Sequence, residues 1–218
     1  MQDYVFAADT RGLWWRRNWY LLQSQLRGRL GRQEAIHVPE HYTYLGSGWE
    51  WQAYLDTESG LIVKYPAGVF AEVGTPEYLE SVRENYELLR ALDSELCVET
   101  AFERAEGTNR ITQAEIDPFD RMFRFGELSD AERESLRHVT ALMRQCLDKY
   151  DWMPDVRPKY FVDRAYLSNL CWNEELQRLQ LYDFSSALDL FRIDPLFTSS
   201  QKKHFLSRMA KITRKLRL

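Results

Sequence analysis

Five residues in this sequence, at three places along the chain, could together handle a triphosphate and a metal ion. Gly46 and Gly48 flank Ser47 in the string YLGSGWEWQAYL. Lys64 follows in the apolar string LIVKY, and Asp183 lies far downstream in LYDFSSAL. Backbone N–H groups beside glycine can approach phosphate oxygens, a lysine offsets phosphate charge, and a carboxylate binds the accompanying metal ion. Their order along the chain predicts phosphoryl-transfer chemistry.

The segments around the first three places predict strands joined by tight turns and followed by a helix. Short apolar runs separated by glycine-containing turns are typical of an antiparallel meander. Pro76 is well suited to the first turn of a helix, and apolar residues recur at helical spacing after it. The expected elements are strands at 42–45, 51–55 and 61–65, a helix at 77–92, and a further strand pair at 98–105 and 110–116.

The second half of the chain predicts mainly helices with one short hairpin. Ser129 and Glu132 have the spacing of a capping box, which predicts a helix from there to about residue 150. Residues 117–120, DPFD, are expected to form a linker. The remaining expected elements are strands at 170–172 and 179–182 and amphipathic helices at 12–31 and 199–216.

In this order, the elements and motifs of residues 42–190 resemble the protein-kinase-like phosphotransferase superfamily. The short chain is similar to its minimal bacterial members, such as PhoP-regulated kinase-like proteins and compact effector kinases. The resemblance implies an α+β, bilobal, protein-kinase-like fold. It implies an antiparallel β N-lobe with one helix at 42–117 and a reduced, mainly helical C-lobe at 118–218 that ends in a basic helix. Residues 1–41 would form a basic helical extension.

The resemblance assigns the nucleotide's phosphates to the first lobe. Gly46, Ser47 and Gly48 would cradle them, and Lys64 would hold the α- and β-phosphates. A lysine buried in an apolar strand needs a counter-charge, because an unpaired buried ammonium is costly. The family takes this charge from the next helix, where Glu84 is the first choice and Glu80, one turn earlier, is the alternative.

The resemblance also implies magnesium ligands and an adenine-binding segment. Asn169 in LSNLCW and Asp183 match the family's two metal-binding residues, and both offer the hard oxygen ligands that magnesium prefers. Phe184 is kept after the aspartate, whereas Ser185 replaces the family's glycine. Glu115 and Asp117 could offer backbone groups to adenine, and the sequence does not choose between them.

Three departures from the family pattern concern the catalytic machinery. Trp51 stands where the family has its third glycine. The family's catalytic aspartate comes five residues before the asparagine, but here Arg164 occupies that position and Asp163 precedes it. Asp163 is therefore either the catalytic base that accepts the substrate hydroxyl proton or only a partner of Arg164. The chain also ends without the family's Ala-Pro-Glu segment.

Each of these residues has a plainer interpretation. The Gly46–Gly48 string could be an ordinary hairpin turn, and Lys64 could point to solvent from an edge strand. Asn169 could be a turn residue, and Asp183 could cap a strand end. The combination of all four in family order favours the catalytic interpretation.

The resulting functional hypothesis is an ATP- and Mg-dependent phosphotransferase, most readily a small atypical Ser/Thr protein kinase. Lys64, Asp163 and Asp183 would be its catalytic residues. One alternative is a pseudokinase that binds nucleotide or a partner without turnover. Another is a kinase of a sugar or lipopolysaccharide hydroxyl, so the acceptor is a protein or a saccharide.

Composition and charge limit the remaining possibilities. The chain has 218 residues with 44% hydrophobic residues, enough for a packed core, and it contains no run long enough for a transmembrane segment. Three widely spaced cysteines predict buried apolar thiols and a cytoplasmic location. Residues 11–32 and 201–218 carry six and seven cationic side chains without an acid. These basic ends could lie against the acidic middle of the chain, face water, or contact an anionic surface.

Overall fold

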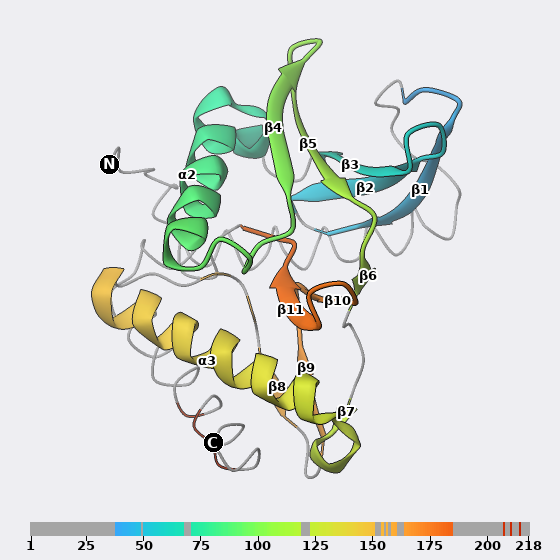
Figure 1. Cartoon of the computed structure of the whole chain (residues 1–218). Coiled ribbons are helices and arrows are strands. Elements are labelled where there is room, and N and C mark those ends of the chain that lie inside the picture. The colour runs from blue at the N-terminus through green and yellow to red at the C-terminus, as the bar shows by residue number, and fades with distance from the viewer. Residues whose placement is uncertain are drawn as a thin grey trace. The chain divides into compact units, whose positions relative to one another are not determined.

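A computed structural model of the chain describes residues 38–48, 50–67, 71–118, 123–150, 154, 156, 158–160, 164–184, 207, 210 and 214. The chain divides into two compact units. The first unit takes in residues 1–80 and 99–115, and the second takes in residues 81–98 and 116–218. The division falls within helix α2 (Pro76–Leu92), whose course is shown in Figure 1.

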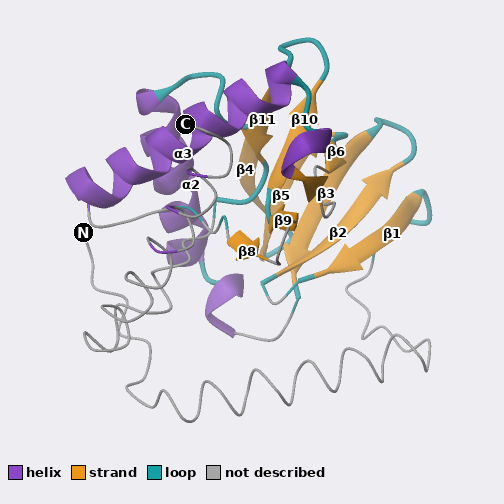
Figure 2. Cartoon of the chain, turned by 90° about the horizontal axis from the view of Figure 1, so that it is seen from below, coloured by secondary structure: helices purple, strands orange, loops and turns teal. Residues whose placement is uncertain are grey.

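The first unit is built on one five-stranded antiparallel sheet. Its strands are β1 (Tyr42–Ser47), β2 (Trp51–Asp56), β3 (Leu61–Pro66), β4 (Thr100–Ala105) and β5 (Thr108–Ala114). They lie in the order β1-β2-β3-β5-β4, as Figure 2 shows. Tight turns connect all neighbouring strands except β3 and β5. The predicted three-stranded meander and the predicted second strand pair are both confirmed.

Strand alternation gives this sheet two different faces. Tyr54, Val63 and Tyr65 form a buried cluster on one face, where Val38 and Tyr42 pack against them. The neighbouring residue Lys64 belongs to the opposite face, because successive side chains of a strand alternate. The sheet therefore separates an aromatic face from the face that carries the lysine.

A buried asparagine ties the start of α2 to this sheet. Asn109 of β5 is fully buried, and its side-chain amide donates to the carbonyls of Val73, at 2.7 Å, and Thr75, at 2.6 Å. Arg104 donates in turn to the Asn109 side-chain oxygen at 3.2 Å. The Thr75 hydroxyl accepts a backbone N–H from the first turn, and Pro76 follows as the first helical residue. The helix predicted at 77–92 is thus confirmed.

The second unit contains helix α3 (Asp130–Tyr150), which begins as the sequence predicted. The Ser129 hydroxyl accepts the Glu132 backbone N–H at 3.1 Å, and the Glu132 carboxylate accepts the Ser129 N–H at 2.7 Å. This reciprocal pair is a complete capping box. The buried face of α3 consists of Ser135, Leu136, Val139, Thr140, Leu142, Met143 and Cys146.

Two three-stranded sheets complete the described part of the second unit. One has the order β11-β10-β6, formed by β6 (Asp117–Pro118), β10 (Leu170–Asn173) and β11 (Arg178–Leu181). The other has the order β7-β9-β8, formed by β7 (Phe123–Arg124), β8 (Pro158–Tyr160) and β9 (Arg164–Leu167). A short 3₁₀ turn precedes α2 at Ala71–Gly74 and another follows β7 at Phe125–Glu127. The sequence predicted only the β10–β11 hairpin among these strands.

One prediction is wrong in this region. The start of the expected linker, Asp117–Pro118, pairs with Trp172 and Cys171 and is an edge strand. Proline is tolerated there because an edge strand leaves one side without a ladder bond.

The observed architecture is α+β: one five-stranded antiparallel sheet, two long helices and small accessory sheets. The predicted helix at 12–31 lies outside the described residues. Of the predicted helix at 199–216, only Ser207, Ala210 and Arg214 are described, and they are helical. Within the described part of the chain, neither α2 nor α3 has the apolar length needed to cross a membrane.

Candidate functional site

The predicted phosphate cradle lies at the β1–β2 connection of the first unit. Gly46 and Ser47 end β1, after a register shift between Tyr44 and Gly46. The Gly48 N–H donates to the Trp51 carbonyl at 2.8 Å and closes the hairpin. The Ser47 hydroxyl donates to the Gly48 carbonyl at 3.0 Å.

The backbone conformation of the β1–β2 hairpin does not require glycine at position 46 or 48. Neither Gly46 nor Gly48 has the positive φ that would favour glycine. Among the described residues, a Cβ added at Gly46 would meet nothing within 4 Å, and one at Gly48 would meet only the Trp51 carbonyl oxygen, at 3.8 Å. An ordinary turn could therefore accept alanine at both positions. The open space beside this backbone would suit a ligand that approaches closely.

Lys64 lies in the middle of the first unit's sheet. In β3 it pairs with Ala53 of β2 and Ile111 of β5, so β3 is an interior strand. Its residue surface is only 9% exposed. The interpretation of Lys64 as a solvent-facing lysine of an edge strand is therefore wrong. A lysine as deeply buried as Lys64 requires an anionic or polar partner for its ammonium group.

The two candidate counter-charges of Lys64 belong to different units. Both Glu80 and Glu84 are exposed on α2. Glu80 belongs to the first unit together with Lys64, whereas Glu84 belongs to the second. The pairing of Lys64 with Glu84, and the alternative pairing with Glu80, both stay predictions.

The two predicted metal ligands lie together in the second unit. Asn169 forms the tight turn before β10, and Asp183 comes two residues after the end of β11. Leu170 pairs with Leu181, and the Tyr182 N–H donates to the Asn169 carbonyl at 3.2 Å. The β10–β11 hairpin thus brings the backbone of Asn169 against the residue that precedes Asp183.

The turn at Asn169 has an unusual backbone conformation. Its φ is 62°, in the left-handed region that asparagine adopts more readily than most residues. Both Asn169 and Asp183 are half-buried, so their oxygens could reach a metal ion that water or phosphate also contacts. This backbone conformation explains why an asparagine is tolerated at position 169.

Phe184 fixes the chain directly after Asp183. Its side chain is 2% exposed, and its ring meets that of Tyr86 edge to face at 4.9 Å between centroids. The Asn85 side chain donates to the Phe184 carbonyl at 3.0 Å. The second unit's part of α2 therefore contacts the backbone beside the candidate metal ligand.

The remaining residues that the sequence analysis singled out lie at four further positions. Glu115 is exposed directly after β5 in the first unit, and Asp117 opens β6 in the second. Asp163, the candidate catalytic base, lies outside the described residues. Trp51, at the family's third-glycine position, is 7% exposed, and its ring centroid lies 6.1 Å from that of Tyr78.

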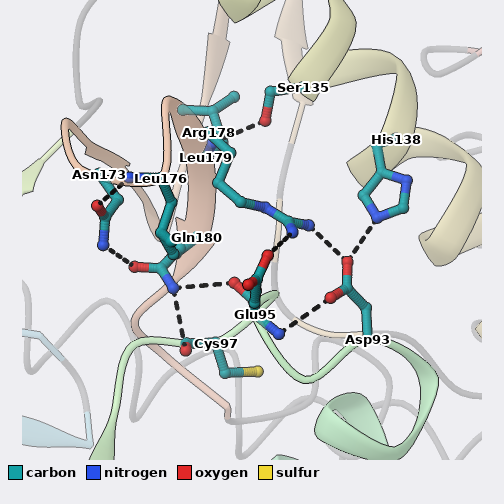
Figure 3. A network of polar contacts seen from close by, with 10 residues as sticks. All are labelled: Asp93, Glu95, Cys97, Ser135, His138, Asn173, Leu176, Arg178, Leu179 and Gln180. Carbon is teal, nitrogen blue, oxygen red and sulfur yellow. Dashed lines mark hydrogen bonds and ion pairs between the residues drawn. The ribbon is translucent and has the colours of Figure 1, made fainter.

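Sequence reasoning missed a cluster of charged residues in the second unit. Arg178 of β11 contacts Asp93 at 2.5 Å and Glu95 at 2.8 Å, and His138 of α3 contacts Asp93 at 2.6 Å (Figure 3). We call these four residues the Asp93 clamp. They come from segments 45 and 85 residues apart, so no local pattern in the sequence could have revealed them.

The clamp perturbs the ionisation of its central carboxylate. Burial opposes charge on Asp93, but hydrogen bonds from His138, the Glu95 N–H and Arg178 outweigh burial and hold the pKa of Asp93 below its ordinary value. The carboxylate is thus kept charged by donors from several elements.

The prediction that the cysteines are buried thiols is confirmed. Cys97, Cys146 and Cys171 are free and buried. Burial raises the pKa of the Cys97 thiol strongly and that of the Cys146 thiol to about 11. The thiols of Cys97 and Cys146 are therefore poor nucleophiles and poor metal ligands at neutral pH.

Neither a protein-family model nor a curated protein matches the chain. Within the described residues, no group of three or more His, Cys, Asp and Glu side chains could hold a metal ion. Asn169 and Asp183 together offer two oxygen ligands. Such a pair suits a magnesium ion that takes its remaining ligands from water and phosphate.

Proposed function

We propose that the chain is an ATP- and Mg-dependent phosphotransferase with a bilobal, protein-kinase-like fold. The β10–β11 hairpin, which brings Asn169 beside the Asp183 segment, carries this proposal. Two half-buried oxygen ligands at one end of a hairpin suit a magnesium ion bound to a nucleotide.

Two features of the first unit support the same function. Lys64 is a buried cation on the interior strand β3, and it would bind the α- and β-phosphates. Gly46 and Gly48 leave open space beside a backbone whose conformation does not require glycine. In the proposal, phosphate oxygens occupy that space and accept backbone N–H groups.

The proposed chemistry consists of positioning and charge neutralisation. Asn169 and Asp183 would hold the magnesium ion, and Asp163 would accept the proton of the attacking hydroxyl. The proposed acceptor is a Ser or Thr hydroxyl of a protein. We propose Glu80 and Glu84 as the alternative partners of Lys64, to be separated by Glu80→Gln and Glu84→Gln.

The test is transfer of labelled phosphate from ATP, with magnesium, to the protein itself or to a generic protein acceptor. Asp183→Asn and Lys64→Met should each reduce the rate on the order of 100-fold or more. The first removes a carboxylate that would hold the magnesium ion, and the second removes a cation that would neutralise phosphate charge. Asp148→Asn, which changes an exposed residue of α3, is the matched control and should retain the full rate. Equal rates for Asp183→Asn and Asp148→Asn would refute the proposal.

A second candidate function is a nucleotide-binding module without turnover. Burial of Trp51 at the family's third-glycine position favours it, because a packed indole replaces a residue without a side chain. This candidate predicts that ATP raises the unfolding temperature of the wild type but not of Lys64→Met. It also predicts no phosphate transfer by either protein.

A further inference from the structure

The connection between α2 and β4 acts as an additional strand beside β11. Leu181 donates its N–H to the Leu96 carbonyl at 2.7 Å, and Val98 donates to the Leu181 carbonyl at 2.9 Å. The Gln180 side chain donates to the carbonyls of Glu95, at 2.9 Å, and Cys97, at 3.3 Å. Residues 93–98 therefore cover the edge of β11 that β10 leaves open.

The Asp93 clamp fastens this connection at one end of β11. One carboxylate oxygen of Asp93 contacts both Arg178 and His138, and the other accepts the Glu95 N–H at 3.0 Å (Figure 3). The side chains of Asp93 and Arg178 are only 15% and 18% exposed. A charged hydrogen bond between partly buried groups is stronger than a pair on the surface.

The other end of β11 leads to the candidate metal ligands. Leu181 is bonded on both sides, to residues 96–98 on one edge and to Leu170 on the other. Leu170 follows Asn169, and Leu181 is two residues before Asp183. A shift of residues 93–98 along β11 would therefore break the hydrogen bonds of Leu181. It would thereby change the distance between the Asn169 and Asp183 segments.

We propose that Asp93 is a positioning residue, which holds residues 93–98 against β11 and thereby fixes the Asn169–Asp183 pair for its metal ion. The proposal rests on the proposed function, because that function makes this pair the magnesium site. Asp93 itself does not touch metal or substrate. It acts through Leu181, whose backbone is hydrogen-bonded to residues 96 and 98 on one edge and paired with Leu170 on the other.

The chemistry of the clamp favours a carboxylate at this position. Asp93 faces Arg178 from β11, His138 from α3 and the Glu95 N–H from its own loop, and Arg178 also contacts the Glu95 carboxylate. An amide at position 93 keeps only one acceptor oxygen, so its NH₂ group would face either the Arg178–His138 pair or the Glu95 N–H, all of which are donors. A supporting residue of this kind typically changes metal affinity about 10- to 100-fold when it is replaced.

The experiment compares the full-length wild type with Asp93→Asn and Glu134→Gln. Glu134 forms an exposed ion pair with Arg137 at 2.8 Å within α3, so its substitution removes a carboxylate without touching β11. Hydrogen exchange of the Val98 and Leu181 amides reports whether residues 93–98 stay on β11. Mn²⁺ affinity, measured by electron paramagnetic resonance with a non-hydrolysable ATP analogue, reports on the metal site. Affinity for the analogue without metal separates a metal effect from a general loss of structure.

Asp93→Asn should speed exchange at both amides and weaken Mn²⁺ binding roughly 10-fold, with metal-free nucleotide affinity unchanged. Glu134→Gln should behave as the wild type does. Unchanged exchange, or faster exchange with unchanged Mn²⁺ affinity, would overturn the proposal while leaving the proposed function intact. A wild type that binds no Mn²⁺ would instead refute the proposed function, and the exchange data would still decide whether the clamp holds the connection. Should Asp93→Asn not fold, Arg178→Lys keeps the positive charge but loses the two-pronged contact, and it should show the same effects to a smaller degree.

Discussion

The two units are assembled in different ways. In the first unit, most strands pair with the strand that precedes or follows them in the chain, and turns of a few residues join them. In the second unit, β6 pairs with β10, and β7 pairs with β9, across more than 35 residues. Its charged contacts join segments 45 and 85 residues apart.

This difference has a consequence for how each unit holds its candidate site residues. Lys64 lies in a sheet in which short turns join every neighbouring pair of strands except β3 and β5. The segments of Asn169 and Asp183 contact residues far away in the sequence, namely Asn85, Tyr86 and residues 93–98. We therefore expect substitutions far from the site in sequence to matter more in the second unit.

The largest expected effect is at Phe184, whose carbonyl accepts a hydrogen bond from Asn85, 99 residues earlier in the chain. Phe184→Ala should reduce the free energy of unfolding by about 3–5 kcal/mol, because it leaves a cavity beside Tyr86. Urea denaturation followed by circular dichroism measures this value. Phe184→Leu, which keeps most of the volume, should cost clearly less. Equal losses for the two variants would show that packing at this contact is not what holds the segment.

A second test compares the free energy of unfolding lost when a buried asparagine and a half-buried asparagine are each replaced by alanine. Asn109→Ala in the first unit should cost about 2–4 kcal/mol, because it leaves the carbonyls of Val73 and Thr75 without their donor. Asn173→Ala in the β10–β11 turn removes two hydrogen bonds near solvent and should cost about 1 kcal/mol. Thermal unfolding of both variants checks the order. The reverse order would contradict the idea that burial of the unsatisfied carbonyls decides the loss.

The third test measures how the stability contributed by Asp93, in the second unit, depends on pH. The folded state lowers the pKa of Asp93, so this residue adds stability above its ordinary pKa of 3.8, and that stability is lost as pH falls through the folded value. The difference in unfolding free energy between the wild type and Asp93→Asn should therefore be full at pH 6 and shrink toward pH 3. Urea titrations at several pH values measure it. A difference that stays constant with pH would show that charge on Asp93 is not involved.

The smallest expected effect is at the capping box of α3, which involves residues only three positions apart. Ser129→Ala removes the hydroxyl that caps α3 and should cost about 1 kcal/mol. Ser94→Ala, an exposed substitution outside this cap, should cost close to nothing. A loss at Ser129 as large as that at Phe184 would mean that local capping, and not distant contact, dominates the stability of the second unit.

Sequence could predict those parts of the fold that rest on neighbouring residues. The 42–65 meander, the start of α2 at Pro76 and the Ser129 capping box all follow from alternation, proline placement or a three-residue spacing. The β10–β11 hairpin was also predictable, because Asn173 and the residues after it form a polar turn between apolar runs. The β6 strand was missed because a two-residue strand has no periodicity, and its proline favoured a linker.

The candidate site was predictable only in part, for a related reason. A lysine inside LIVKY signals burial because its neighbours are apolar, and Lys64 is indeed buried. Asp93, His138 and Arg178 gave no such signal, since each is a polar residue in a context that equally suits solvent. Their importance comes from partners that only the folded chain supplies.

The burial of Cys97, Cys146 and Cys171 makes it possible to label engineered cysteines and to measure the distance between the two units. Because no native thiol is exposed, a single cysteine placed at Glu58 in the first unit and another at Glu174 in the second would be the reactive sites for fluorescent labels. Energy transfer between such labels, with and without ATP and magnesium, would then report directly whether nucleotide draws the units together.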